Sequence, residues 1–242
     1  FLDDIYTLSS KIRFPFQILA IALILLQGDL LNMPLYLSLI YLILGVGFVN
    51  MFNFMDGING ITGIYSLSVL LGIYYVNDFE QIVNQELIIY AAISLIVFGF
   101  YNFRRKALFF AGDIGSIAVG MLIFFILYLF FIKFSSPLVL LFVIIYGADA
   151  SCTLLYRFIY TKESVLDPHR HHIYQKLVDV YKISHLKVSL FYGVLQLLMI
   201  FIFVKTYKLE KNIQFIVFLG IVVFLTLLYI YIYNRVKNKK TL

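Results

Sequence analysis

Cysteine, tryptophan, proline and charge are all scarce in this chain of 242 residues. It has 1 cysteine, 0 tryptophans, 4 prolines and 13% charged residues, against 62% hydrophobic residues. A single cysteine, Cys152, excludes an intrachain disulfide framework and a thiolate metal site, and we interpret it as a small buried residue. The shortage of charge, with a mean hydropathy of +0.95, excludes an ordinary soluble globular domain.

Long apolar runs take the place of charge along the whole chain. A helix needs about 20 residues to cross about 30 Å of hydrocarbon. The runs therefore predict an all-α polytopic membrane protein with about eight transmembrane helices and cytoplasmic catalytic loops. The predicted spans are residues 14–31, 35–49, 61–76, 87–101, 115–132, 138–156, 188–204 and 213–233.

Basic residues are distributed unevenly over the loops that these spans leave. One side of the membrane receives 15 of the 19 lysines and arginines and the other side receives 4. The positive-inside rule places the basic side in the cytoplasm. The net charge of +6 therefore reflects orientation and attraction to anionic lipid, and does not indicate nucleic-acid binding. Four clusters of polar residues all fall on this same side, where chemistry at the bilayer surface is expected.

The first cluster is a pair of adjacent carboxylates, Asp3 and Asp4, which precedes the first span. Adjacent carboxylates repel each other and stay ionised most easily beside a cation. The pair therefore indicates Mg²⁺ handling or a base that acts toward a hydroxyl or phosphate. A helix cap in a solvated turn is the alternative.

The second cluster has amides and a carboxylate at every third position. Its members are Asn50, Asn53, Asp56 and Asn59. This spacing keeps them near one face of a helix or of its end, and Gly57 and Gly60 let the backbone turn and approach a ligand closely. Such groups suit a nucleobase, a ribose or a metal-bound phosphate. A polar helix cap at the end of a span is the alternative.

Two further carboxylates lie next to or inside spans. Asp113, in Gly112-Asp113-Ile114-Gly115-Ser116, directly precedes a span, where it could bind a metal while free backbone N–H groups face an anion. An ordinary N-cap is the alternative. Asp149 lies within the sixth span and needs a buried partner, for which Arg157 is the candidate. We expect that pair to be structural rather than catalytic.

The fourth cluster is the densest in basic residues. His169, Arg170, His171 and His172 follow Pro168. Their spacing differs from the i, i+4 histidine pair of helical zinc sites. It favours a diphosphate clamp in which Arg170 donates two hydrogen bonds, with a solvated basic loop as the alternative. Residues 174–180 are predicted to form a short amphipathic helix near the interface.

Taken in order, the four clusters resemble the polyprenyl-phosphate N-acetylhexosamine-1-phosphate transferases, the family that includes the phospho-N-acetylmuramoyl-pentapeptide transferases. The matching elements are the pair Asp3–Asp4, NxxNxxDGxxG at 50–60, GDxGS at 112–116 and HRxHxYQ at 169–175. The last element resembles the branch that starts O-antigen and other surface polysaccharides. The resemblance covers essentially the whole chain.

The resemblance implies an enzyme of the bacterial inner membrane whose active site faces the cytoplasm. It would transfer a sugar-1-phosphate from a UDP-N-acetylhexosamine, with 6-deoxy sugars among the options, to undecaprenyl phosphate and release UMP. Its cofactor would be Mg²⁺, with Mn²⁺ as a substitute. Its partners would be the two substrates, the lipid bilayer and, in a homodimer, a second copy.

The resemblance also implies roles for the cluster residues. Asp113 is the first choice for the metal ligand, with Asp56 as a second. Asp3 and Asp4 would deprotonate or orient the lipid phosphate. The catalytic set is then Asp3, Asp4, Asp113 and His169, and the substrate-binding set is Asn50, Asn53, Asp56, Asn59, Arg170 and His172.

Two departures from the family pattern add expectations. Family members have ten or eleven spans, so we expect about two further helices upstream of Phe1, with residues 1–242 forming one transferase domain. Asn59 stands where murein-precursor members have aspartate, which argues against that substrate. Two rival functions are a membrane zinc hydrolase that uses the histidines, and a transporter, for which polar groups near the midplane are too few.

Overall fold

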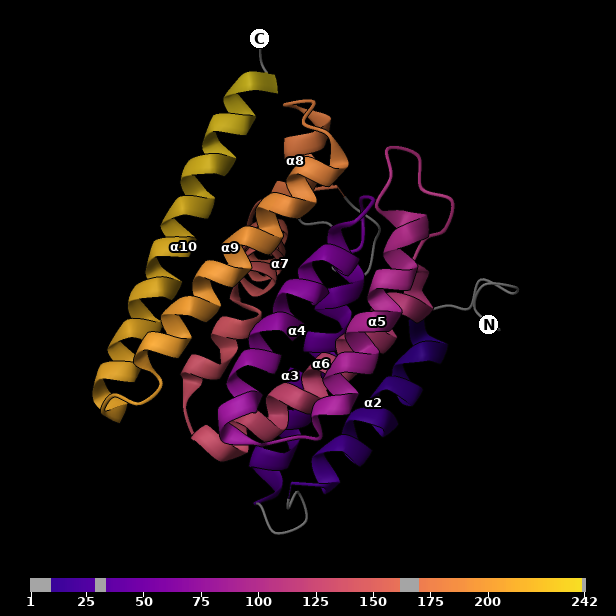
Figure 1. Cartoon of the computed structure of the whole chain (residues 1–242). Helices are drawn as coiled ribbons and strands as arrows, with labels where there is room; N and C mark the ends of the chain where they lie inside the picture. The colour runs from indigo at the N-terminus through magenta and orange to yellow at the C-terminus, as the bar shows by residue number, and fades with distance from the viewer. Residues whose placement is uncertain (1–9, 29–33, 162–169, 241–242) are drawn as a thin grey trace.

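Helices account for all the regular structure in the part of the chain that the computed structural model describes, residues 10–28, 34–161 and 170–240. Figure 1 shows their arrangement. The α-helices are α2 (Ser10–Leu26), α3 (Leu35–Phe54), α4 (Ile61–Glu80), α5 (Gln85–Asn102), α6 (Gly112–Phe134), α7 (Ile144–Tyr156), α8 (Ile173–Asp179), α9 (His185–Thr206) and α10 (Lys211–Lys240). A 3₁₀ helix, η2 (Pro137–Phe142), precedes α7, and a π-helix, η3 (Arg157–Thr161), follows it. This confirms the all-α prediction.

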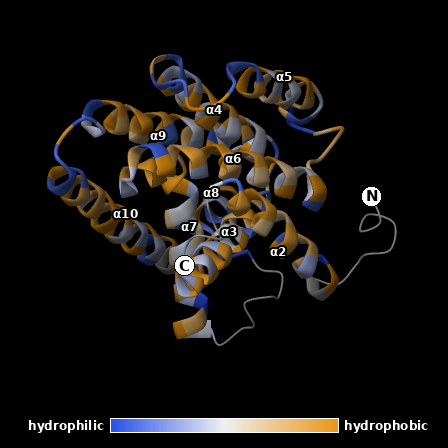
Figure 2. Ribbon diagram, turned by 90° about the horizontal axis from the view of Figure 1, so that it is seen from below, coloured by the Kyte–Doolittle hydropathy of each residue, from blue (hydrophilic) through white to orange (hydrophobic). Residues whose placement is uncertain are grey.

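Five of the described helices are long and apolar enough to cross a membrane: α3, α5, α6, α9 and Lys211–Val236 of α10. The apolar part of α2, Ile12–Leu26, is shorter. Figure 2 shows hydrophobic residues along the helices and hydrophilic residues mainly at loops and helix ends. The chain is therefore a polytopic membrane protein, as predicted.

Helix α4 occupies the interior of the bundle. It packs chiefly against α9 and α5, and it buries serines and an asparagine as well as apolar side chains, among them Ser66, Ser68 and Asn77. A helix enclosed by protein can carry such polar groups because its neighbours supply hydrogen-bond partners. This explains why α4 is a less apolar helix than its neighbours.

The sixth predicted span, 138–156, is not one helix, which corrects the sequence prediction. The chain forms η2, breaks at Val143 and continues as α7. The amide of Gln196 donates to Leu141 O at 2.7 Å, and the hydroxyl of Tyr65 accepts from Tyr146 N at 3.2 Å. Broken helices persist in membranes only where buried partners satisfy the freed backbone groups, and sequence periodicity does not reveal such partners.

One end of the bundle gathers every described polar cluster. The α3–α4 loop, the α5–α6 loop, α8 and the end of α10 all lie at the top of Figure 1, whereas the turns α4–α5 and α9–α10 lie at the bottom. The predicted grouping on one face is confirmed for these segments. Asp3, Asp4 and His169 lie outside the described residues.

Candidate active site

The Asp113 side chain, on α6, contacts side chains from two other helices. It lies in the first turn of α6, after Gly112, whose φ of +60° favours glycine. Its Oδ1 accepts a hydrogen bond from Asn53 Nδ2 of α3 at 2.8 Å, and its Oδ2 accepts from the guanidinium of Arg13 on α2. The Asp113 side chain is 41% exposed. A carboxylate is therefore held in place by an amide and a cation while it still faces solvent.

The donor atoms around Asp113 fit Mg²⁺. The Asn53 amide nitrogen also lies 3.2 Å from Ser116 Oγ, which brings a hydroxyl oxygen close to the carboxylate. Within residues 10–28, 34–161 and 170–240 there is no group of three or more His, Cys, Asp or Glu that could hold a metal by itself. Mg²⁺ characteristically uses one or two carboxylates and completes its shell with water and substrate phosphates. A sparse oxygen site of this kind suits it.

Asp56 is a second carboxylate, in the loop after α3. Burial raises its pKa above the usual 3.8, and a hydrogen bond from Thr62 Oγ1 to Asp56 Oδ1, 2.6 Å long, partly opposes that rise. Desolvation disfavours the charged form of such a group until a cation or donor compensates it. A raised pKa at the polar end of the bundle is typical of a functional carboxyl.

The every-third spacing of the second cluster does not give one shared face, which corrects the sequence prediction. Helix α3 ends at Phe54, so only Asn50 and Asn53 lie on it. Asn50 Nδ2 donates to Gln17 Oε1 on α2 at 2.9 Å and to the carbonyl of Val46 at 2.9 Å. The amide of Asn50 therefore braces α3 against α2, one turn below Asn53.

Asn59 is engaged with other loops. Its Nδ2 donates to the carbonyl of Arg104 at 3.1 Å, its backbone N–H donates to His185 Nδ1 at 3.3 Å, and its carbonyl accepts from Ser189 Oγ at 2.9 Å. Next to it, Gly60 has φ +84°, which supports the predicted turn. Asn59 thus ties the α3–α4 loop to the α5–α6 loop and to α9, instead of pointing with Asn53 toward one ligand.

Helix α8 packs directly on the loop that carries Asp56. Tyr174 OH donates to the carbonyl of Phe54 at 3.1 Å, and a Cβ added to Gly57 would lie 2.2 Å from the same hydroxyl. Gly57 therefore makes room for Tyr174, not only for a ligand. The predicted short helix at 174–180 is confirmed, although it packs against protein, with Tyr174 buried.

The two described members of the basic cluster with predicted substrate roles contact carboxylates of the protein. Arg170 Nε and Nη2 each donate to a carboxylate oxygen of Asp179 at 2.9 Å. His172 is buried, with Nδ1 3.4 Å from Asp149 Oδ1. The expected Asp149 partner, Arg157, is buried as well, but Asp149 contacts His172, which corrects the predicted pairing. The sequence could not show this because 23 residues separate the two.

Three contact residues at this end were missed by sequence reasoning. Arg13 holds Asp113, Thr62 donates to Asp56, and His185 accepts from Asn59. Only Thr62 carries a local signal, since it lies six residues after Asp56 and opens α4. The contacts of Arg13 and His185 depend on how distant helices pack.

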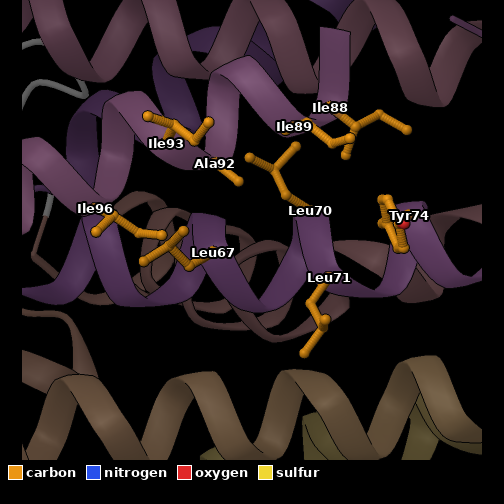
Figure 3. Close-up of a pocket in the computed structure, with 9 residues that line it drawn as sticks. All are labelled: Leu67, Leu70, Leu71, Tyr74, Ile88, Ile89, Ala92, Ile93 and Ile96. Atoms are coloured by element: carbon orange, nitrogen blue, oxygen red, sulfur yellow. The ribbon is translucent and has the colours of Figure 1, made fainter. Parts of the chain in front are cut away.

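Two apolar grooves open on the sides of the bundle. One, of about 370 Å³, lies between α4 and α5 and is drawn in Figure 3; its walls are leucine, isoleucine, alanine and one tyrosine, Tyr74. The other, of about 490 Å³, lies among α7, α8, α9 and α10. Neither is lined by Asp113 or Asp56, but Asp149 and Ile173 of α8 line the second groove.

Comparisons with known proteins agree with this picture. Residues 1–131 match the family model of glycosyl transferase family 4. The phospho-N-acetylmuramoyl-pentapeptide-transferase of Streptococcus gordonii is 39% identical over 101 residues, which are 38% of this chain and 31% of that protein. The enzyme of the same name from Streptococcus mutans is 32% identical over 102 residues, 39% of this chain and 29% of that protein.

That of Streptococcus pneumoniae is 31% identical over 103 residues, 38% of this chain and 31% of that protein. The matched stretches thus span less than a third of these relatives' length. The family match itself extends over more than half of the chain and contains Asn53, Asp56 and Asp113. This chain belongs to glycosyl transferase family 4.

Proposed function

We propose that the protein transfers a sugar-1-phosphate from a UDP-N-acetylhexosamine to undecaprenyl phosphate and releases UMP. The observation that carries the proposal is the convergence of Asp113, Asn53 and Arg13 from three helices. It occurs at the same end of the bundle as the Asp56 loop and α8. Family membership and the similarity to pentapeptide transferases support the reaction class.

Both substrates carry negative charge where they must meet, so the site has to lower their repulsion. Asp113 and Asp56 would hold the Mg²⁺, which when bound supplies charge stabilisation to the phosphates. Arg13 adds a fixed positive charge beside Asp113, and guanidinium groups bind phosphate oxygens in pairs. Asn53, which donates to Asp113, would contact the nucleotide or its diphosphate.

The basic segment would act on the departing UMP. Arg170 is 55% exposed at its side chain, so it can exchange Asp179 for a diphosphate oxygen at little cost, since exposed ion pairs contribute about 0–1 kcal/mol. His169 and His172 would assist it. Asp3 and Asp4 would orient or deprotonate the lipid phosphate.

The finer assignment follows the sequence resemblance. We infer a UDP-N-acetylhexosamine of the surface-polysaccharide branch, 6-deoxy sugars included, and an O-antigen-like product at the cytoplasmic face of the bacterial inner membrane. Asn59 stands where murein-precursor members of the family have aspartate, which favours a substrate other than the murein precursor; its amide donates to the Arg104 carbonyl. A homodimer is part of the same proposal.

The test is an assay of UMP release by the purified, complete gene product. It uses a panel of UDP-N-acetylhexosamines, with and without undecaprenyl phosphate, in Mg²⁺, in Mn²⁺ or after chelation. We expect release that requires the lipid and Mg²⁺ and that favours one sugar. No release with any sugar contradicts the proposal. Activity lost to a zinc-selective chelator and restored only by zinc supports the hydrolase instead.

A further inference from the structure

We propose that Asp149 is a positioning residue that fixes His172 and α8 against the loop that carries Asp56. This inference rests on the proposed function, because it assigns Asp149 to the site that binds the UDP-sugar diphosphate. It goes beyond the structural role expected for a carboxylate inside a span. It also identifies which elements of the site that carboxylate holds together.

The contacts of Asp149 converge on α8. Asp149 is 4% exposed, and groups from α7, α9 and the start of α8 surround it. Its Oδ1 lies 3.0 Å from Ile173 N, and its Oδ2 lies 3.3 Å from Tyr174 N and 2.6 Å from Tyr192 OH. The two other neighbours are His172 Nδ1 at 3.4 Å and Thr153 Oγ1 at 3.2 Å.

A charge at this place is expensive, which argues for a function beyond packing. Buried carboxylates in membrane segments cost several kcal/mol unless they are paired. Here the compensation comes from two backbone N–H groups at the first turn of α8, a histidine ring and a tyrosine hydroxyl. These donors belong to α8 and α9, so the charge of Asp149 secures α8 to α7 and α9.

Helix α8 needs such an anchor because it is short. It has 7 residues, and isolated helices of fewer than about 12 residues are marginal in water. Its position is therefore set by tertiary contacts at its two faces. Asp149 holds the start, and Tyr174 holds the other face through the carbonyl of Phe54 and the space beside Gly57.

The helix thus joins two parts of the proposed site. On one side, His172 contacts Asp149 directly and Arg170 lies two residues before it in the chain. On the other side, Tyr174 rests on the loop that leads to Asp56. A shift of α8 moves Arg170 and His172 relative to Asp56. A displacement of about 1 Å in an active site can lower the rate by about 100-fold.

The experiment compares three variants of the complete, purified enzyme. Asp149→Asn removes the charge and Tyr192→Phe removes one donor to it. Tyr229→Phe is the matched control, because it removes a hydroxyl that lies 2.8 Å from Thr153 Oγ1 in the same buried network and keeps the ring that packs with Ile173 of α8. The readouts are kcat and KM for each substrate, and the melting temperature.

We expect Asp149→Asn to lower kcat/KM for the UDP-sugar by about 100-fold, with KM for undecaprenyl phosphate within about twofold of the unaltered enzyme. Tyr192→Phe should show the same pattern at smaller size, and Tyr229→Phe should be near normal. Unchanged kinetics in Asp149→Asn, or an equal loss for both substrates in all three variants, overturns the proposal in favour of a packing role.

A measurement that needs no turnover separates this proposal from the proposed function. A spin label at Lys182→Cys, in a Cys152→Ser background, reports the mobility of the turn after α8. We expect faster label motion in Asp149→Asn and none of this change in Tyr229→Phe. If the unaltered enzyme releases no UMP, the proposed function is wrong, and the label mobility alone tests whether Asp149 holds α8 in place. Equal label mobility in all forms overturns the positioning role of Asp149.

Discussion

Two carboxylates at the polar end of the bundle have opposite surroundings. Asp113 is half-exposed and already faces a cation, Arg13, whereas Asp56 is largely enclosed and contacts a neutral hydroxyl, Thr62. Carboxylates in such different environments usually take different roles. Under the proposed function, the exposed Asp113 would be the first ligand of the ion and the enclosed Asp56 the second.

Replacing Asp113 by asparagine should lower UMP release by about 100-fold or more, as loss of a charged group at a phosphoryl-transfer site does. Folding should persist, because Asn retains an acceptor for Asn53 and an exposed ion pair with Arg13 contributes only about 0–1 kcal/mol. The measurements are UMP release and melting temperature. Glu86→Gln, a substitution of an exposed residue at the opposite end of the bundle, is the control. Near-normal UMP release by Asp113→Asn would rule out Asp113 as the metal ligand.

Replacing Asp56 by asparagine should stabilise the protein and impair turnover. The pKa of Asp56 is raised in the folded state, so its ionisation costs stability as pH rises from 3.8 through the raised pKa, and the cost persists at pH 7. Asp56→Asn should therefore raise the melting temperature at pH 7. The gain should vanish near pH 3.

The same raised pKa predicts how turnover depends on pH. Activity that needs ionised Asp56 should fall as pH drops through that pKa, which lies above the 3.8 of a free aspartate. Asp78→Asn, an exposed aspartate at the other end, is the control. A lower melting temperature in Asp56→Asn at pH 7 contradicts the burial argument.

At the scale of elements, α8 and the α3–α4 loop form one unit. Tyr174 is buried against Phe54 and Gly57, and Asn102 joins this region to the α5–α6 loop by accepting from Gly60 N at 2.7 Å and donating to Phe109 O at 2.7 Å. Buried side-chain bridges of this kind satisfy backbone groups that no helix can satisfy. The loops are thus positioned by specific contacts.

Gly57→Ala should disturb this unit, because the new Cβ would lie 2.2 Å from the buried Tyr174 hydroxyl. Overpacking of this kind costs about 1–3 kcal/mol, and UMP release should fall with it. Tyr174→Phe in the same chain removes the clashing oxygen and should restore part of the loss in a double-mutant cycle. The measurements are melting temperature and kcat/KM; additive effects in the double variant contradict the contact. Gly47→Ala, with no atom within 4 Å of the added Cβ, is the control.

At the scale of the whole molecule, the fold separates a polar end from apolar sides. α10 shows this most clearly, since only 6% of its spanning window is buried inside the protein. Most of its side chains are therefore left uncovered by the rest of the chain, and their apolar character suits the hydrocarbon of a bilayer. The polar end is where two charged substrates could meet at the membrane surface.

The orientation of that end can be tested by labelling. In a Cys152→Ser background, Lys106→Cys in the α5–α6 loop should react with an impermeant maleimide only when the cytoplasmic side is accessible. Lys208→Cys, in the α9–α10 turn, should react in intact cells from outside, and Asp78→Cys serves as a second outer-side position. Reversed accessibility contradicts the positive-inside assignment.

Much of this could be predicted from the sequence where the signal is local. Apolar length predicts helices, as in α6 and α9, and loop position predicts that Asp56 and Asp113 share one end. Non-local signals are different: the spacing of Asn50 to Asn59 predicted one face, but α3 ends at Phe54. The broken span at Val143 was missed because the residues that satisfy it, Gln196 and Tyr65, are distant in sequence.

The chain's sequence by itself determined that it is helical, that it lies in a membrane and which loops carry acid, amide and imidazole, because hydrophobic length and charge bias act residue by residue. Only the tertiary structure decided which of those groups meet. Arg13 contacts Asp113, and Asp149 contacts His172 and not its predicted partner, Arg157. A buried charged group pairs with the hydrogen-bond donor that helix packing brings closest to it, and that packing depends on contacts among all the helices.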